Sequence, residues 1–232
     1  RLSTLMSPII GTWDDIDDVR AKFQYRIASL HARWQKEGTF ITTDPVQTVE
    51  WLHYYLQYHG LSEYNHQVMM ANFYSSVVVG LQWIAPQLKK KTPRSSDSSG
   101  RRIDSAVDSS AGRRIKVGFM SKFFGEGQPH GLLLEGVISG LPRNEFEVIV
   151  FEVPGASGNS LNPVIFKSAD QVVKLQLVLS TVRQTLASHT LDVLIFADGM
   201  GEPVNYFVAM GTRVAPVQCM FWGNPVTTGG SN

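Results

Sequence analysis

The sequence of 232 residues has a single cysteine, Cys219, which excludes a disulfide framework and a zinc site built on several thiolates. No apolar run comes near the roughly 20 residues that span a bilayer, and no signal-peptide pattern opens the chain. Lys plus Arg (21) and Asp plus Glu (20) nearly cancel, which gives no indication of a nucleic-acid partner. Neither a membrane nor a nucleic acid is therefore expected as a partner, and a cytoplasmic or nuclear location is expected.

The charge is unevenly distributed and divides the chain into three. Residues 1–88 carry 6 basic and 8 acidic side chains, and residues 115–232 carry 7 and 9. The segment between them, 89–114, carries 8 basic against 3 acidic side chains, with many serines and almost no large apolar residues. Such a segment cannot bury enough surface to offset its ordering entropy, so it is interpreted as a flexible linker. Docking on an acidic partner or phosphorylation of its serines is the alternative.

Residues 1–88 have the pattern of helices. A capping-box start at Thr12 and an apolar stripe at helical spacing predict a helix that ends near residue 38. Two further helices are predicted, at about 45–58 and 62–83, the first of them opened by a proline. The many aromatic side chains of this segment favour a helix-packing core over a ligand cage.

The last segment changes to the pattern of strands. Four runs are rich in branched and aromatic residues, namely 115–121, 146–153, 191–197 and 217–221. The third run is almost continuously apolar, as buried parallel strands are, so Ile195 is expected to be buried on both faces of a sheet, and Cys219 in the fourth is expected to be buried too. Helical stretches lie between the runs, at 131–141, 179–188 and 203–210. This alternation predicts an α/β fold, a Rossmann-like half with a parallel sheet.

Ligands of parallel sheets bind at the carboxyl ends of the strands, so the loops there hold the candidate site residues. The loops after the first, third and fourth runs are rich in glycine, which lets backbone N–H groups approach a sugar or phosphate closely. His130 in the first loop is either a general base or sugar partner, or only the start of a helix. Asp198 in the second either binds a hydroxyl or forms a turn before Gly199.

The sequence does not support three other kinds of functional site. The three histidines at positions 53, 59 and 66 do not fit two metal ligands on one helical face, so no metal is expected. The glycines after the first strand do not match the dinucleotide fingerprint, and no acidic residue follows the second strand to bind a ribose. A nucleophile elbow G-x-S-x-G is also absent, which leaves an esterase without support.

Four stretches of the last segment together carry a resemblance. They are R-I-K-V-G-F-M-S followed by P-H-G-L-L-L-E-G, then L-D-V-L-I-F-A-D-G-M-G, and finally A-P-V-Q-C-M-F-W-G-N-P-V-T-T-G. In this order they resemble the catalytic region of the O-GlcNAc transferases linked to tetratricopeptide repeats, a family that includes the plant SPINDLY-type proteins. The resemblance implies an inverting glycosyltransferase with two Rossmann-like lobes. Its donor would be UDP-GlcNAc, or GDP-fucose in some members, and its acceptors would be Ser or Thr hydroxyls of intracellular proteins.

The resemblance also implies site residues. Asp198 stands where many members have Asn, and Gly199 matches the glycine after it. The loop that faces the sugar in the family corresponds to a stretch that holds Gly223, Asn224, Pro225, Thr227 and Gly229. One departure concerns the family's histidine followed by proline after the first strand. Ungapped counting places Gly127 there, whereas alignment on the proline places Gln128 there. His130 lies two or three places later and can take the role only if the loop is rearranged.

The chain is therefore expected to be the amino-terminal part of such a transferase, in which residues 1–88 precede the catalytic region and residues 115–232 form its first lobe. The second lobe, which holds most nucleotide contacts in the family, and the 34-residue repeats are absent, so little activity is expected of this piece alone. A nucleotide-sugar donor and protein acceptors are the expected partners, with no cofactor. The alternatives are a non-catalytic binding module derived from the family and an unrelated nucleotide-binding α/β protein.

Overall fold

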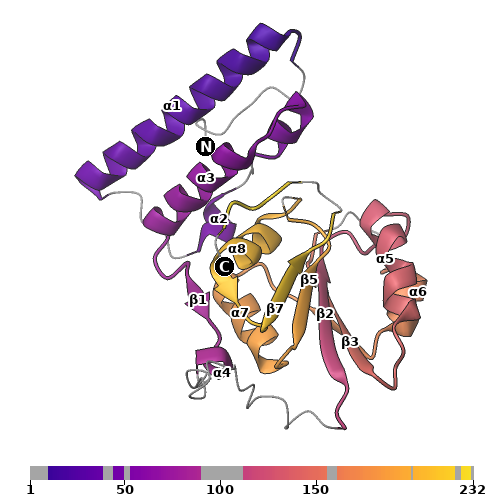
Figure 1. The fold of residues 1–232 in the computed structure, drawn as a ribbon. Coiled ribbons are helices and arrows are strands. Elements are labelled where there is room, and N and C mark those ends of the chain that lie inside the picture. The colour runs from indigo at the N-terminus through magenta and orange to yellow at the C-terminus, as the bar shows by residue number, and fades with distance from the viewer. Residues whose placement is uncertain are drawn as a thin grey trace, which may run out of the picture.

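The computed structural model describes residues 10–38, 44–49, 53–89, 112–155, 161–199, 201–222 and 226–230. A helical amino-terminal part lies beside an α/β part with a single large sheet (Figure 1). Most of the predicted linker lies outside the described residues. Within the described ranges, no helix combines the length and the apolar character that crossing a membrane requires.

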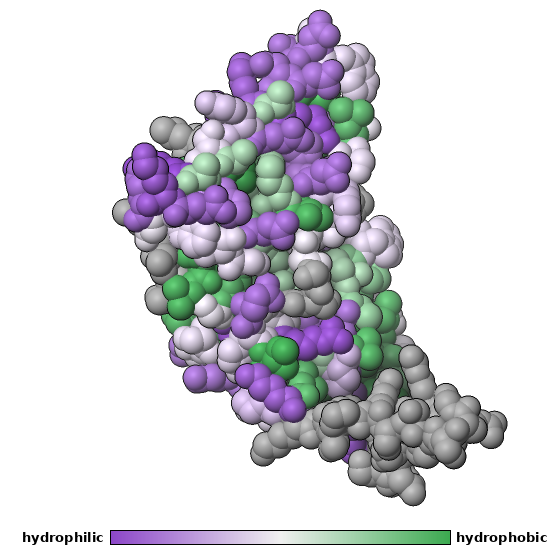
Figure 2. Space-filling model, turned by 60° about the vertical axis from the view of Figure 1, so that its left-hand side comes forward, coloured by the Kyte–Doolittle hydropathy of each residue, from purple (hydrophilic) through white to green (hydrophobic). Residues whose placement is uncertain are grey.

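The first helix, α1 (Trp13–Glu37), begins and ends as its sequence predicts. The Thr12 hydroxyl accepts a hydrogen bond from the backbone N–H of Asp15 at 3.2 Å, and the Asp15 carboxylate accepts one from the backbone N–H of Thr12 at 3.1 Å. This reciprocal pair is the predicted capping box. Gly38 ends the helix in the left-handed region at a φ of 64°. Hydrophilic side chains cover much of the face of α1 that Figure 2 shows.

The next helices are shorter than predicted. The chain forms α2 (Pro45–Thr48), the 3₁₀ helix η2 (Tyr54–His59) and α3 (Tyr64–Val77). Instead of continuing to residue 83, α3 ends where three successive valines reach Gly80, whose φ of 68° is left-handed. Branched residues are poor helix formers, and a left-handed glycine cannot continue a helix. The two-residue strand β1 (Trp83–Ile84) and α4 (Pro86–Lys89) follow.

Five parallel strands form the sheet, in the spatial order β4-β3-β2-β5-β7. Their bounds are β2 (Ile115–Ser121), β3 (Phe146–Glu152), β4 (Gln171–Lys174), β5 (Val193–Phe196) and β7 (Val217–Met220). The intervening elements are α5 (Pro129–Gly140), α6 (Pro163–Ser168), α7 (Leu179–Ser188), α8 (Pro203–Gly211) and the short strand β6 (Thr212–Arg213). The predicted α/β fold class is confirmed, and β4 and α6 are additions to it.

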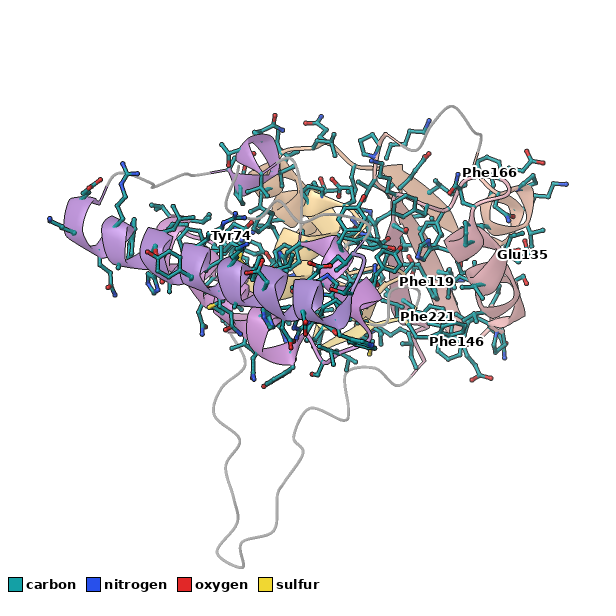
Figure 3. All side chains as sticks on the ribbon, turned by 90° about the horizontal axis from the view of Figure 1, so that it is seen from above. Tyr74, Phe119, Glu135, Phe146, Phe166 and Phe221 are labelled. Carbon is teal, nitrogen blue, oxygen red and sulfur yellow. The ribbon has the colours of Figure 1, made fainter. Side chains whose placement is uncertain are left out.

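Helices cover both faces of this sheet (Figure 1). Phe119, labelled in Figure 3, and Val150 belong to one hydrophobic cluster with residues of α5 and α6. Phe151 and Leu194 belong to another, with residues of α7 and α8. Ile195 is half-buried, so the expectation that it is buried on both faces is wrong. A strand side chain faces only one side of its sheet, so the burial of Ile195 depends on what covers that side alone.

Strand β7 pairs on one side only, with β5, among the described strands. Cys219 is therefore exposed, contrary to the expectation that it is buried. Its strand neighbours Val217 and Met220 are also exposed. The sequence pattern identifies the strand correctly but cannot show that it lies at an edge, because edge and central strands share the same apolar composition.

A buried arginine joins the helical part to the α/β part. Arg183 of α7 donates hydrogen bonds to the Thr212 hydroxyl at 2.8 Å, to the carbonyl of Gly80 at 2.9 Å and to the carbonyl of Leu81. Beside it, β1 pairs in parallel with β6. The hydrophobic cluster on this side of the sheet also continues into α1 and α3 through Phe23, Ile27, Tyr74, Tyr206 and Phe207. The two parts therefore share one core.

Candidate functional site

The strand order reverses between β2 and β5. From β2 the chain moves outward to β3 and β4, and it then returns to β5 and β7 on the other side. Loops that follow the two strands at such a reversal leave in opposite directions, which opens a crevice at their carboxyl ends. Ser121 ends β2, and Asp198 follows β5 by two residues. Both residues thus lie where open parallel sheets bind their ligands.

Asp198 is completely buried and is held through one of its two carboxylate oxygens. Oδ2 accepts a hydrogen bond from the Ser121 hydroxyl at 2.6 Å and another from Nδ2 of Asn205, on α8, at 2.9 Å. The Ser121 oxygen itself accepts from the backbone N–H of Phe123 at 2.9 Å, which leaves the hydroxyl proton for Asp198. Oδ1 of Asp198 and Oδ1 of Asn205 make no hydrogen bond with the described residues.

The protonation of Asp198 reflects opposing influences. Burial raises the pKa of its carboxyl group, because the charged form loses water. The hydrogen bonds from Ser121 and Asn205, the backbone N–H of Gly201 and the nearby imidazole of His130 act in the opposite direction. A carboxyl group with a raised pKa at a strand end of this kind is typical of functional sites, although structural networks also produce such shifts.

His130 lies close enough to Asp198 to favour its ionised form. It is the second residue of α5, and its ring packs on Phe123 with centroids 5.2 Å apart. Both ring nitrogens are buried and lack a hydrogen-bond partner among the described residues. His130 therefore makes no capping hydrogen bond with the described residues, and it lies near Asp198.

A second acid, Glu202, lies at the start of α8. Its Oε2 accepts a hydrogen bond from the backbone N–H of Asn205 at 3.1 Å, as a helix cap, and the residue is 4% exposed. Burial raises the pKa of Glu202 to about 7, and the neighbouring carboxyl of Asp198 adds to this effect. The hydrogen bonds from Asn205 and Val204 and the charge of Lys122 only partly oppose the increase.

Glu202→Gln should remove a pH dependence of stability. Because the folded pKa of about 7 exceeds the ordinary value of 4.5, the folded state holds a proton that the unfolded state releases. This contribution is complete below the unfolded pKa and is lost as the pH rises through 7, by at most about 3 kcal/mol. Urea denaturation at acidic and alkaline pH should show the glutamine variant gaining stability over the wild type as the pH rises. Glu145→Gln, at an exposed position, is the control and should leave the pH dependence of stability unchanged. The expectation would be contradicted if stability depended on pH in the same way for Glu202→Gln and for the wild type.

The other predicted residues are placed differently. Gly199 lies against the end of β7 and the last described segment, since a Cβ there would stand 2.9 Å from Met220 and 3.5 Å from Thr228. Thr227 is exposed, and its hydroxyl accepts a hydrogen bond from the backbone N–H of Gly229 at 3.1 Å. Gly229 faces α3, where a Cβ would come within 2.2 Å of the Gln67 carbonyl oxygen. The remaining predicted residues, Gly223, Asn224 and Pro225, lie outside the described residues.

The structure thus brings His130 and Asp198 together and adds three residues that sequence reasoning missed, namely Ser121, Glu202 and Asn205. Ser121 carries a detectable signal, because it is a polar residue at the carboxyl end of an otherwise apolar strand. Glu202 precedes a proline at a helix start, a pattern that indicates a cap. Asn205 carries no such signal, since its role depends on which face of α8 meets the sheet.

No protein-family model and no curated protein sequence matches this chain. Among solved structures, it is similar to a mutant of the O-GlcNAc transferase of Thermobaculum terrenum, with a TM-score of 0.53 and 18% sequence identity. The match covers 90% of this chain and 36% of that chain, so the chain spans about a third of the length of the transferase. At this identity the likeness shows the fold, a Rossmann-like half with a helical amino-terminal segment.

Proposed function

We propose that this chain is the first lobe of a glycosyltransferase, which transfers a sugar from UDP-GlcNAc, or from GDP-fucose, to Ser or Thr of proteins in the cytoplasm or nucleus. The observation that carries the proposal is the buried pair of Ser121 and Asp198, with His130 near Asp198, at the strand reversal of an O-GlcNAc-transferase-like fold. In this proposal residues 1–88 precede the catalytic region, 89–114 link the parts and 115–232 form the lobe.

The cluster suits a proton transfer. In an inverting transfer the acceptor oxygen attacks the anomeric carbon, the nucleoside diphosphate leaves, and a base removes the proton of the acceptor hydroxyl. In this proposal a ring nitrogen of His130, which has no hydrogen-bond partner among the described residues, takes that proton. The neighbouring carboxylate of Asp198 would stabilise the imidazolium that forms. In this proposal Gly199, Thr227 and the 223–225 segment contribute contacts to the sugar, and neither a metal nor another cofactor takes part.

A transfer assay on the natural polypeptide that contains these residues tests this proposal. Labelled UDP-GlcNAc and GDP-fucose are supplied with a library of Ser- and Thr-containing peptides, and incorporation is measured. His130→Ala is expected to lower the transfer rate by about 100-fold, the lower end of the range for a positioned base. His189→Ala is the matched control, because His189 follows α7 and precedes β5, at the opposite edge of the sheet. Transfer by His130→Ala at the wild-type rate would refute the assigned role.

A non-catalytic binding module is the second candidate. Gln128, which precedes Pro129 at the start of α5, stands where the resembling family has a histidine. A glutamine amide does not titrate and cannot act as a base. Binding of UDP-GlcNAc without transfer from either donor would favour this candidate over the transferase.

A further inference from the structure

We infer that this chain forms a symmetric dimer in which helix α5 of each copy lies on strands β5 and β7 of the other copy. The inference goes beyond the proposed function and does not depend on it. It rests on two uncovered apolar surfaces of the same chain, namely a sheet face over which no helix lies and a helix whose outer face carries no charge.

The first surface is one side of strands β5 and β7. Val193 of β5 pairs with Val217 of β7, and paired residues of parallel strands point to the same side of the sheet. Ile195 pairs with Phe119 of β2 and with Cys219 of β7, so this is the side of the cluster that includes α5 and α6. Val217 is 48% exposed, Cys219 is exposed, and the two β5 residues are only half-buried. Strands β2 and β3 bury their residues on the same side.

The connections between the strands explain why this side of β5 and β7 is left open. Crossovers between parallel strands are right-handed, so the side that receives the helix depends on the direction in which the chain moves across the sheet. The chain moves outward from β2 through α5 and α6 and the opposite way through α7 and α8, which therefore lie on the other side (Figure 1). Because purely parallel sheets are almost always covered on both faces, the position beside α5 is one that a helix should fill.

The second surface is the outer face of α5. Leu132 is 55% exposed, and the exposed Gly136 and Gly140 have open space where a side chain would be. Glu135 is the only Asp, Glu, Lys or Arg residue of the helix, and its carboxylate accepts a hydrogen bond at 2.8 Å from Asn162, the cap of α6. Surface helices usually present charged residues to water, and a helix that is apolar all round is usually buried. A partner is therefore expected to cover the outer face of α5.

One flank of α5 borders the open position. Glu135 marks the flank toward α6, and at 3.6 residues per turn Leu133 and Val137 lie on the opposite flank. They are 41% and 44% exposed. His130 lies on the same flank and is close to Asp198, which follows β5, so this flank is directed toward β5. A helix over β5 and β7 would therefore also pack against Leu133 and Val137.

A second copy of the chain supplies the helix that this position requires. When α5 of one copy enters the open position of the other, a twofold axis places the second α5 in the open position of the first. The lengths agree, since the 12 residues of α5 extend about 18 Å and residues 217–221 extend about 17 Å. Neither surface contains an Asp, Glu, Lys or Arg residue that would oppose the contact, and Gly136 and Gly140 allow a close approach. One contact thus covers both surfaces.

Sedimentation equilibrium of the chain tests the dimer. At micromolar concentration the wild type is expected to approach twice its mass of 25.8 kDa. Gly136→Lys places a charge at the middle of the outer face of α5 and should weaken the dimer at least about 100-fold, because that charge would be buried without a partner. The variant should keep its fold, as measured by circular dichroism, because lysine favours a helix more than glycine does and the Cβ meets open space. Gln184→Lys, exposed on α7, is the control and should leave the dimer unchanged.

Two further measurements test which surfaces meet. Cys219→Glu, on β7, should also give a monomer. An equimolar mixture of Gly136→Lys and Cys219→Glu should form dimers again, because one of its two contacts joins lysine to glutamate and the other keeps both wild-type residues. Alkylation of Cys219, the single cysteine, should become slower in the wild type as the concentration rises, but not in Gly136→Lys.

A wild-type mass that stays at 25.8 kDa over the whole concentration range would overturn the inference. A dimer that persists in both Gly136→Lys and Cys219→Glu would also overturn it, and so would a mixture of the two variants that stays monomeric. If Cys219→Glu does not fold, the alkylation of the wild type decides the matter. An equal rate at low and high concentration would then show that β7 is not part of the contact, contrary to the inference.

Discussion

Arg183→Met should lower the free energy of unfolding by about 2–5 kcal/mol, because each buried acceptor left without its donor costs about 1–3 kcal/mol. The substitution keeps an unbranched chain of similar length but leaves the Thr212 hydroxyl and the carbonyls of Gly80 and Leu81 without their donor. Two of these three bonds are buried, so water cannot readily replace the guanidinium. Urea denaturation followed by circular dichroism measures the loss.

Arg213→Met is the matched control for Arg183→Met. Arg213 belongs to the adjacent strand β6 but makes an exposed hydrogen bond, to the Pro216 carbonyl at 2.7 Å. Its loss should change stability by only about 0.5 kcal/mol. Equal effects of the two substitutions would show that Arg183 does not join the helical part to the sheet as its hydrogen bonds indicate.

Leu194→Ala is the second substitution with a large expected effect, a loss of about 2–5 kcal/mol in the free energy of unfolding. Leu194 lies on β5, between β2 and β7, and is fully buried on the side of α7 and α8. Its removal leaves a cavity that the strands on either side cannot close. Calorimetric and urea unfolding should both register the loss.

Ile195→Ala tests the same strand on its other face. Ile195 is half-buried, so less apolar surface returns to water and the expected loss is clearly smaller than for Leu194→Ala. A larger loss at Ile195 than at Leu194 would mean that the two faces of β5 are assigned the wrong way round.

Most of the fold could be predicted from the sequence, because its main helices and strands have clear local sequence patterns. Strand β2 and helix α7 have the predicted bounds, and the start of α1 follows from its capping box. The elements that were missed are short: β4 has four residues and α6 has six. Pairs such as β1 with β6 cannot be recognised locally, since each strand has two residues and exists only through its distant partner.

Only part of the candidate site could be predicted from the sequence, because the residue pattern locates the strand ends but not the partners of each side chain. The position of Asp198 after a strand predicts where it lies, and the structure places it beside His130. That Asp198 has one engaged and one unengaged oxygen depends on Asn205, seven residues further along and on a helix. Likewise, the family resemblance predicts a sugar contact for Gly229. Its close approach to Gln67 could not be predicted, because it depends on how α3 packs against the last described segment.

The pairing of Trp83 with Thr212 has a consequence for the order of events during synthesis. The partner of β1 is made about 130 residues after β1 itself, which at 5–20 residues per second is roughly 6 to 26 s later. Arg183, which donates hydrogen bonds to the carbonyls of Gly80 and Leu81, is also synthesised long after them. Throughout this interval, the apolar face that α3 later buries against α8, where Tyr74 packs on Tyr206 and Phe207, has no native counterpart on the nascent chain. Helices α1 and α3 are thus made well before the strand and the arginine that complete their contacts, and chaperones have a long opportunity to bind there.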